Sequence, residues 1–358
     1  MDIVDITEID KNFNLPQVNE PDIEWFDARE TPFALHGVFF DQGTDRFMRM
    51  PYDVADKVSV GVRFGAHITT GGRLKFITDS PYIAIKAVIP SYLPMNHMPV
   101  VGSHGFSLYL DGRFFGMYTP QNAEIVRANP SNLAFNMIRY ISPKKEYDFD
   151  LYFPLYGGVI RLYIGLQKGS VLKAPKPYTN PKPMVFYGSS ITQGGCASRP
   201  GNDYVSLVCK WLNSDFINLG FSGNAKGETA MAEHLASLDA SAYVLDYDYN
   251  APNAEHLQQT HYPLYECIRK AKPNVPILFI SKPDFEYDGS SAKRRAVIIE
   301  TFEKAKQNGD NLVAFIDGET LFGDFGRDGC TVDTCHPNDL GFYRMAQVVY
   351  PVLKELLK

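Results

Sequence analysis

The sequence has few cysteines and no long uninterrupted apolar run. Its five cysteines are scattered and odd in number, which is typical of a reducing compartment where thiols stay free. No stretch approaches the roughly 18 consecutive apolar residues of a membrane-spanning helix. The acidic N-terminus MDIVDITEIDKNFNLPQ also lacks the apolar core of a signal peptide. These absences predict a cytoplasmic protein without a membrane partner.

Clusters of basic residues are absent as well. The formal net charge is −6, and no block of Lys and Arg offers a surface for a nucleic acid. The chain is 45% hydrophobic and 21% charged, as expected for a globular protein with a sizeable core. Its 358 residues suggest two domains. Nothing in the sequence decides between a monomer and a homo-oligomer.

The first half of the chain, residues 1–172, shows the patterns of strands. KVSVGVRFGAHI alternates apolar and polar side chains, and GFSLYLDGRFFGMY predicts a hairpin with Asp111-Gly112 at its turn. Many short strands with Gly and Pro turns indicate a β-sandwich or jelly roll. The following stretch KAPKPYTNPKP, residues 173–183, has four prolines and predicts a stiff linker between two domains.

The second half, residues 184–358, alternates short apolar runs with amphipathic helical segments. This order predicts a five-stranded parallel sheet covered by helices on both faces, a three-layer α/β sandwich. Ligands of such sheets bind beyond the carboxyl ends of the strands. The predicted strands are 184–188, 216–220, 242–247, 276–281 and 312–317. The predicted helices are 203–212, 228–238, 257–271, 293–308 and about 338–357.

Two serines follow the first predicted strand of this half, in MVFYGSSITQGG. Ser189 and Ser190 stand where active sites of parallel sheets gather, but a serine hydroxyl needs a base to become a nucleophile. The alternative is an N-cap, in which a serine binds a free N–H of the following helix. Position alone favours the cap.

A base is available in TVDTCHPNDLGF, just before the last predicted helix. The carboxylate of Asp333 can receive one imidazole N–H of His336 and leave the other ring nitrogen facing a serine. A loop hydrogen bond or helix cap would explain the same two residues, and both interpretations can hold together.

Two further candidate residues, a glycine and an asparagine, follow the second and third predicted strands. Gly223 in FSGN has no side chain, so its N–H can approach a ligand closely, unless it is only a turn glycine. Asn250 in DYDYNAP offers an amide to an oxyanion, or is a turn residue before Pro252. The pair His97 and His104 lacks HExxH or Cys–His spacing, so we expect no metal and no cofactor.

Taken in order, these blocks resemble the SGNH (GDSL-type) hydrolases. GSSI stands in the place of the Gly-Asp-Ser-Leu block, with Ser190 at the nucleophile position and Ser189 replacing the usual Asp. FSGN, DYN and DTCHP match the later blocks, although Asp248 replaces the usual Gly of the third block. GFSLY resembles the Gly-x-Asp-Leu-Tyr element of the two-domain branch with an N-terminal β-sandwich.

The resemblance implies a flavodoxin-like catalytic domain over residues 184–358, behind an accessory β-sandwich over residues 1–172. It implies a carboxylic ester hydrolase that works through an acyl-enzyme, with acetylated sugars or oligosaccharides as expected substrates. The implied triad and oxyanion hole use Ser190, His336 and Asp333, then the N–H groups of Ser190 and Gly223 and the amide of Asn250.

Several points stay open beside this expectation. An acyltransferase would use the same triad, a carbohydrate-binding protein could carry an inactive hydrolase domain, and a Ser–His dyad would make Asp333 dispensable. Acyl chain length and sugar identity are not indicated. Tyr247 and Tyr249 flank the third block and are candidates for substrate contacts, as is Trp25, for which packing on a strand is the alternative.

Overall fold

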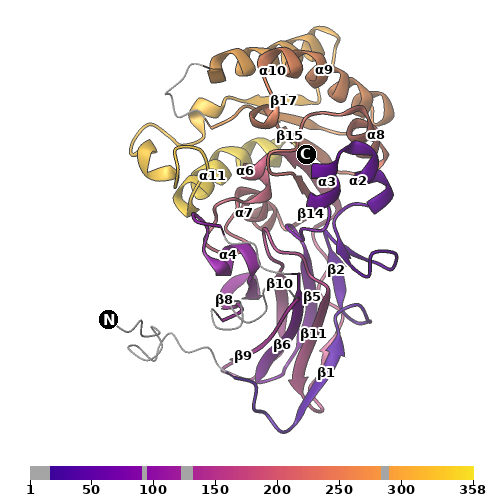
Figure 1. The fold of residues 1–358 in the computed structure, drawn as a ribbon, viewed down its shortest axis with the longest axis vertical. Helices are drawn as coiled ribbons and strands as arrows, with labels where there is room; N and C mark the ends of the chain where they lie inside the picture. The colour runs from indigo at the N-terminus through magenta and orange to yellow at the C-terminus, as the bar shows by residue number, and fades with distance from the viewer. Residues whose placement is uncertain (1–16, 91–94, 122–131, 284–289) are drawn as a thin grey trace.

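The computed structural model describes residues 17–90, 95–121, 132–283 and 290–358. Figure 1 shows antiparallel strands in the lower part of the molecule and a layered α/β domain above them. The predicted fold class, an α/β sandwich with a five-stranded parallel sheet behind an antiparallel β domain, is confirmed. Among the described residues, no helix combines the length and apolar character that a membrane crossing requires.

Two antiparallel sheets face each other in the N-terminal β domain. Its strands are β1 (Ile23–Asp27), β2 (Ala34–His36), β3 (Phe39–Asp41), β4 (Arg46–Met48), β5 (Arg73–Thr78), β6 (Tyr82–Ile89), β7 (Phe106–Leu110), β8 (Arg113–Tyr118), β9 (Leu133–Tyr140), β10 (Tyr147–Tyr152), β11 (Arg161–Gln167) and β12 (Leu172–Lys173). One sheet has the order β1-β11-β6-β9. The other has the order β12-β5-β10-β7-β8 with β2 beside β5, while β3 and β4 pair separately.

Alternating apolar side chains form the core between these two sheets. Along β6, Ile83, Ile85 and Ile89 all point into this core and are fully buried. On the facing sheet, the rings of Phe76 and Phe149 stack with centroids 5.1 Å apart. The period of two along each strand is therefore what brings the sheets together.

The α/β domain is built on five parallel strands in the order β14-β13-β15-β16-β17. These strands are β13 (Asn180–Gly188), β14 (Ser214–Gly220), β15 (Ala242–Asp246), β16 (Ile277–Ile280) and β17 (Val313–Ile316). Its helices are α6 (Ser190–Gln193), α7 (Tyr204–Leu212), α8 (Thr229–Ser237), α9 (Ala254–Ala271), α10 (Ser290–Gln307) and α11 (Asp339–Leu356), with single 3-10 turns η2 (Asp248–Asn250), η3 (Gly318–Thr320) and η4 (Arg327–Cys330). β13 begins inside the proline-rich stretch 173–183. The division into domains at residues 1–172 and 184–358 stays a prediction.

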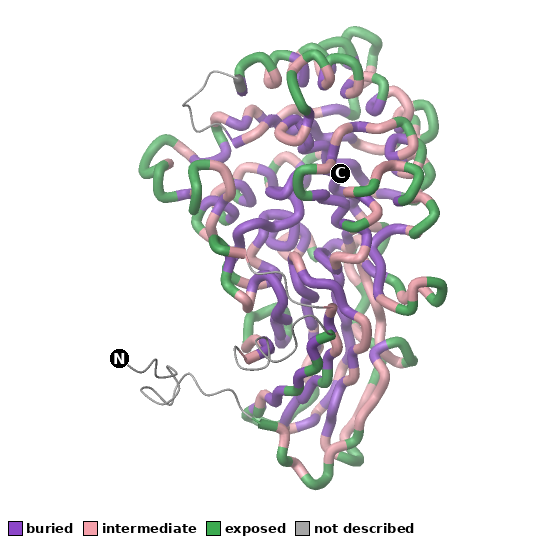
Figure 2. Tube along the Cα trace, in the orientation of Figure 1, coloured by how far each residue is buried: buried purple, intermediate pink, exposed green. Residues whose placement is uncertain are grey.

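Both faces of this sheet are covered by helices. Along β13, Val185 and Tyr187 pack in the core beneath α8, α9 and α10, whereas Met184 and Phe186 pack in the core beneath α7 and α11. Figure 2 shows these strands as buried segments, with exposed residues on the outer turns of the helices. Apolar residues at both faces explain why the strands appear in the sequence as continuous apolar runs.

One strand prediction in the first half is wrong. KVSVGVRFGAHI does not pair in a sheet: most of it lies in the helices α2 (Tyr52–Val58) and α3 (Val60–Gly65), and its last three residues form a turn. A third short helix, α4 (Val100–His104), precedes β7. Ser59 begins α3 by accepting a hydrogen bond from the N–H of Val62 at 3.1 Å. Val62 is buried while Val60 and Phe64 are exposed, so the alternating pattern does not mark a sheet face.

The helices α2 and α3 pack against the α/β domain rather than the β-sandwich (Figure 1). Ala55 and Val62 belong to the same apolar core as Phe221 and Met231 of the α/β domain. A side chain at Gly61 would meet the Asn224 side chain at 1.8 Å, so glycine permits this close approach. The first half of the chain therefore completes the core of the second.

A buried ion pair joins the two domains. The guanidinium of Arg73, on β5, is fully buried and binds the carboxylate of Asp215 on β14, as well as the carbonyl of Phe216 at 3.1 Å. Nδ1 of His36 lies 2.9 Å from the same carboxylate. Burial raises the pKa of Asp215, but the contacts with His36 and Arg73 outweigh it and lower the pKa below its usual value.

Replacing Asp215 with asparagine is expected to destabilise the protein by about 3–5 kcal/mol, because Arg73 would keep a buried charge without its counterion. Chemical denaturation at neutral pH measures this loss. Asp239 is the matched control, since its ion pair with Lys182 is largely exposed. The change Asp239→Asn should alter the free energy of unfolding by at most about 0.5 kcal/mol. Equal losses in the two variants would contradict this account.

Candidate active site

Ser190 lies at the carboxyl end of β13, where the chain turns sharply into α6. A side chain at Gly188 would meet Oγ1 of Thr192 at 2.0 Å and the carbonyl of Asp246 at 2.3 Å, so this turn requires glycine. Ser189 is the N-cap of α6, and its hydroxyl accepts from the N–H of Ile191 at 3.1 Å. The structure thus separates the two serines, since the cap uses Ser189 and leaves the Ser190 hydroxyl for another partner.

That partner is His336. Oγ of Ser190 lies 2.9 Å from Nε2 of His336, and Nδ1 of the same ring lies 2.7 Å from Oδ2 of Asp333. The other carboxylate oxygen of Asp333 accepts from the backbone N–H of Cys335 at 3.0 Å and of His336 at 2.6 Å. The loop before α11 therefore holds the imidazole in one orientation, with one nitrogen toward the carboxylate and one toward the serine.

Cys335 is a neighbour of this group that the sequence did not single out. Its hydrogen bond with His336 is the largest cause that raises the pKa of His336 to about 9, with burial opposing it and Asp333 adding to it. Burial raises the pKa of Cys335, but hydrogen bonds with His336 and Tyr249 lower it overall. Hydrogen bonds from His336 likewise outweigh burial and hold the pKa of Asp333 below its usual value.

Gly223 lies on the loop after β14 and Asn250 ends the 3-10 turn η2 after β15, so both lie at the same edge of the sheet. Gly223 has a φ of +69°, and a Cβ added there would meet no other atom within 4 Å, so glycine at this place is explained by the backbone conformation and not by crowding. Oδ1 of Asn250 accepts from the N–H of Ala225 at 3.3 Å, so the amide nitrogen of Asn250 is directed away from this N–H. Oε1 of Gln193 accepts from the N–H of Ser222 at 2.9 Å and fixes the same loop to α6.

Arg49 from the N-terminal half anchors the strand that leads to Gly223. Its buried guanidinium donates to the carbonyls of Asn218 at 3.1 Å and Gly220 at 2.6 Å, and it lies over the ring of Phe221 at 4.3 Å. Burial lowers its pKa to about 9. In the sequence, the only sign of this role is a single charge between two methionines, in FMRMP.

The three residues predicted to contact substrate lie in different surroundings. Tyr249 touches Cys335 and so borders the Ser190–His336 pair. Tyr247 is buried, and its hydroxyl donates to Thr260 at 3.3 Å, so its side chain belongs to the core. Trp25 lies on β1 of the β-sandwich, with Nζ of Lys86 4.0 Å from its ring, and the structure does not bring it to the site.

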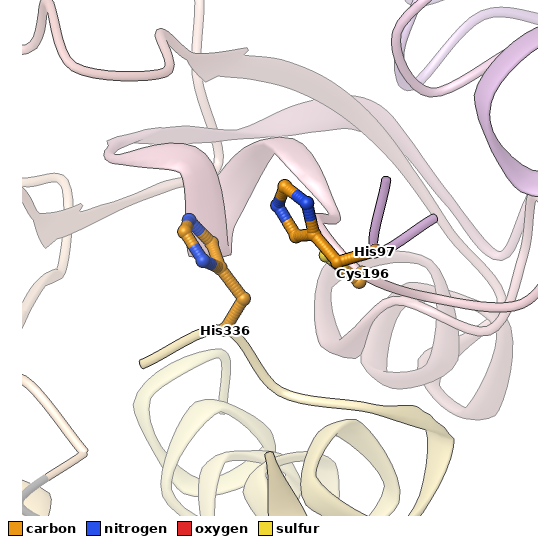
Figure 3. Close-up of side chains that lie close together, drawn as sticks. All are labelled: His97, Cys196 and His336. Carbon is orange, nitrogen blue, oxygen red and sulfur yellow. The ribbon is translucent and has the colours of Figure 1, made fainter. Parts of the chain in front are cut away.

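Within the described parts of the chain, two groups of potential metal ligands share His336. One consists of His97, Cys196 and His336, drawn in Figure 3, and the other of Asp333, Cys335 and His336. Within each group the ligand atoms lie within 4.8 Å of one another. The first group could not be predicted from the sequence, because its members come from three separate segments.

Known proteins are similar to this chain in both halves. Residues 181–354 match the GDSL-like Lipase/Acylhydrolase family, and residues 23–172 match GxDLY, the N-terminus of SGNH-hydrolase-type esterases. No curated protein matches the sequence closely enough to count as a relative.

Solved structures share the whole two-domain arrangement. A GDSL-like lipase from Bacteroides ovatus is 27% identical, with a TM-score of 0.82 over 94% of this chain and 98% of its own. A salicylyl-acyltransferase from a tetracycline biosynthetic pathway is 18% identical, with a TM-score of 0.77 over 94% and 98%. A family two carbohydrate esterase from Clostridium thermocellum, solved with cellohexaose, is 13% identical, with a TM-score of 0.62 over 91% and 99%. The chain belongs to the SGNH (GDSL-type) hydrolases, in the branch whose catalytic domain follows a GxDLY β domain.

Proposed function

We propose that the protein is a serine esterase that removes short acyl groups, foremost acetyl, from sugars or oligosaccharides. The observation that carries the proposal is the chain of contacts from Asp333 through His336 to Ser190, with both hydrogen bonds below 3 Å. This arrangement turns a serine hydroxyl into a nucleophile without a cofactor. The sugar part of the proposal is supported by the fold shared with the carbohydrate esterase from Clostridium thermocellum.

In the proposed reaction, Oγ of Ser190 attacks the ester carbonyl while Nε2 of His336 takes the hydroxyl proton. The N–H groups of Ser190 and Gly223 and the amide of Asn250 donate to the oxyanion that forms. His336 then gives its proton to the leaving alcohol, and an acyl-enzyme on Ser190 remains. In the second half of the reaction, His336 takes a proton from water while the water oxygen attacks this ester. His336 then returns the proton to Oγ of Ser190, and the acid is released.

The proposed role of His336 leads to a prediction about pH. The imidazole must be neutral to accept a proton, so kcat/KM should rise with pH and level off above the pKa of His336. Because contact with Cys335 raises this pKa to about 9, activity should still be rising above neutral pH. Cys335→Ser keeps a hydrogen bond but offers no thiolate charge, so the rising limb should move to lower pH. Coincident profiles of the two proteins would refute this, and Cys267→Ser on α9 is the matched thiol control.

The substrate class is tested by incubating the protein with acetylated monosaccharides and oligosaccharides and following the loss of acetyl groups by mass spectrometry. The same reactions with an added acceptor alcohol separate the esterase from an acyltransferase, since transfer gives a new ester instead of free acetate. Turnover of long-chain lipid esters alone would overturn the sugar proposal. A fully folded protein without activity on any ester would favour a carbohydrate-binding role.

A further inference from the structure

Three side chains from distant parts of the sequence meet beside the Ser190–His336 pair. His97 precedes α4, Cys196 follows α6 and His336 precedes α11, and their ligand atoms all lie within 4.8 Å of one another. The rings of His97 and His336 have centroids 5.6 Å apart, and Figure 3 shows them beside one another near Cys196. His97 is exposed, whereas Cys196 is buried.

Two imidazoles and one thiol form a donor set suited to Zn²⁺. Zinc bonds of about 2.1 Å to nitrogen and 2.3 Å to sulfur place tetrahedral ligand atoms roughly 3.5 Å apart. The ligand atoms of a pair would therefore need to approach each other by up to about 1.3 Å, a shift that an exposed side chain such as His97 can supply. The fourth position would be left to water.

His336 is already oriented as a zinc ligand would be. Its Nδ1 is held by Asp333 at 2.7 Å, so the free lone pair for a metal is on Nε2. Carboxylate–histidine pairs of this kind are the usual outer support of a zinc-bound imidazole. Nε2 is also the atom that lies 2.9 Å from the hydroxyl of Ser190, so one lone pair serves either the serine proton or a metal.

We propose that His97, Cys196 and His336 form an inhibitory site for Zn²⁺ and similar thiophilic divalent cations. The metal binds Nε2 of His336, one ring nitrogen of His97 and the sulfur of Cys196. The thiol proton of Cys196 passes to solvent. His336 then has no lone pair for the proton of Ser190, and the esterase stops. The inhibition rests on the proposed role of His336, whereas metal binding itself does not.

The test uses the full chain after removal of metals by a chelator. Cobalt(II) chloride is added while the near-ultraviolet absorption is followed, because a cobalt–thiolate bond gives a charge-transfer band. In parallel, zinc chloride is titrated into the hydrolysis of 4-nitrophenyl acetate and then removed with EDTA. The variants are Cys196→Ser and His97→Ala, with Cys267→Ser as the thiol control.

We expect one cobalt to bind per chain with a thiolate band, and zinc to inhibit reversibly. Losing an outer partner of a metal ligand already costs about 10–100-fold in affinity, so each of the two variants should need at least tenfold more zinc for half-inhibition. Cys196→Ser should also lose the band, and Cys267→Ser should behave like the unaltered protein. His97 is exposed, so His97→Ala tests the site even if Cys196→Ser is unstable.

Two results would overturn the site. One is the absence of a cobalt–thiolate band in the unaltered protein, and the other is equal zinc inhibition of all variants. The cobalt band does not depend on catalysis, so it separates a failure of the metal site from a failure of the proposed esterase. A chain that binds cobalt through Cys196 but hydrolyses no ester would keep the metal site and reject the esterase.

Discussion

Replacing Ser190 with alanine is expected to lower kcat for 4-nitrophenyl acetate by about 10⁶-fold, the loss seen when a serine hydrolase loses its nucleophile. The reason is local, because among the described residues it is the Ser190 hydroxyl that makes the 2.9 Å contact with Nε2 of His336. The protein should remain folded, since the change removes one oxygen atom from a small side chain. The initial burst of product that marks formation of an acyl-enzyme on Ser190 should also be absent in this variant.

Ser189 supplies the matched control for this change. Its hydroxyl caps α6, so Ser189→Ala should cost about 1 kcal/mol of stability while hydrolysis continues. Circular dichroism and thermal unfolding of both variants distinguish loss of chemistry from loss of fold. If Ser190→Ala kept full activity, or if Ser189→Ala alone abolished it, the assignment of the nucleophile would be wrong.

Replacing Asp333 with asparagine is expected to lower kcat by roughly 10⁴-fold, as for the same change in other triads. An amide at this place can donate to Nδ1 of His336 and so stabilise the wrong tautomer of the ring. Its oxygen can still accept from the backbone N–H groups of Cys335 and His336, so the loop should keep its shape. The pKa of His336 should fall, because the carboxylate that helps to raise it is gone.

Asp339 is a suitable control for this second change. It begins α11 three residues after His336, and its carboxylate accepts from the N–H of Ser198 at 2.8 Å. Asp339→Asn removes a charge of the same sign near the site without touching the imidazole, so activity should stay within about tenfold. A loss of less than tenfold for Asp333→Asn would instead mean that Ser190 and His336 work as a dyad.

The parallel sheet could be predicted from the sequence because its signals are local. Each strand is a short apolar run with glycine, proline or polar residues at its ends, and all five observed strands overlap the predicted ranges. The last helix was equally clear, since Phe342, Met345, Val349 and Leu353 recur at helical spacing and are all buried. Residues at strand ends then pointed to one edge of the sheet.

Other features could not be predicted from the sequence, because they depend on contacts between distant segments. KVSVGVRFGAHI alternates like a strand, but in the structure Ser59 caps α3 and Val62 packs against the α/β core. Arg49 is one arginine among many until its partners, the carbonyls of Asn218 and Gly220, are known. Cys335 and His97 carry no motif of their own, and their significance comes from standing beside His336.

The contact of Arg49 with the end of β14 has a consequence for how this chain can be divided. The proline-rich stretch 173–183 suggests a place to divide the chain, so that the C-terminal half would be expressed alone. Such a fragment would lose the guanidinium that binds Asn218 and Gly220, together with Ala55 and Val62 from its own core. We therefore expect the two halves to unfold as one cooperative unit, and a fragment that begins at residue 184 to be less stable than the whole chain.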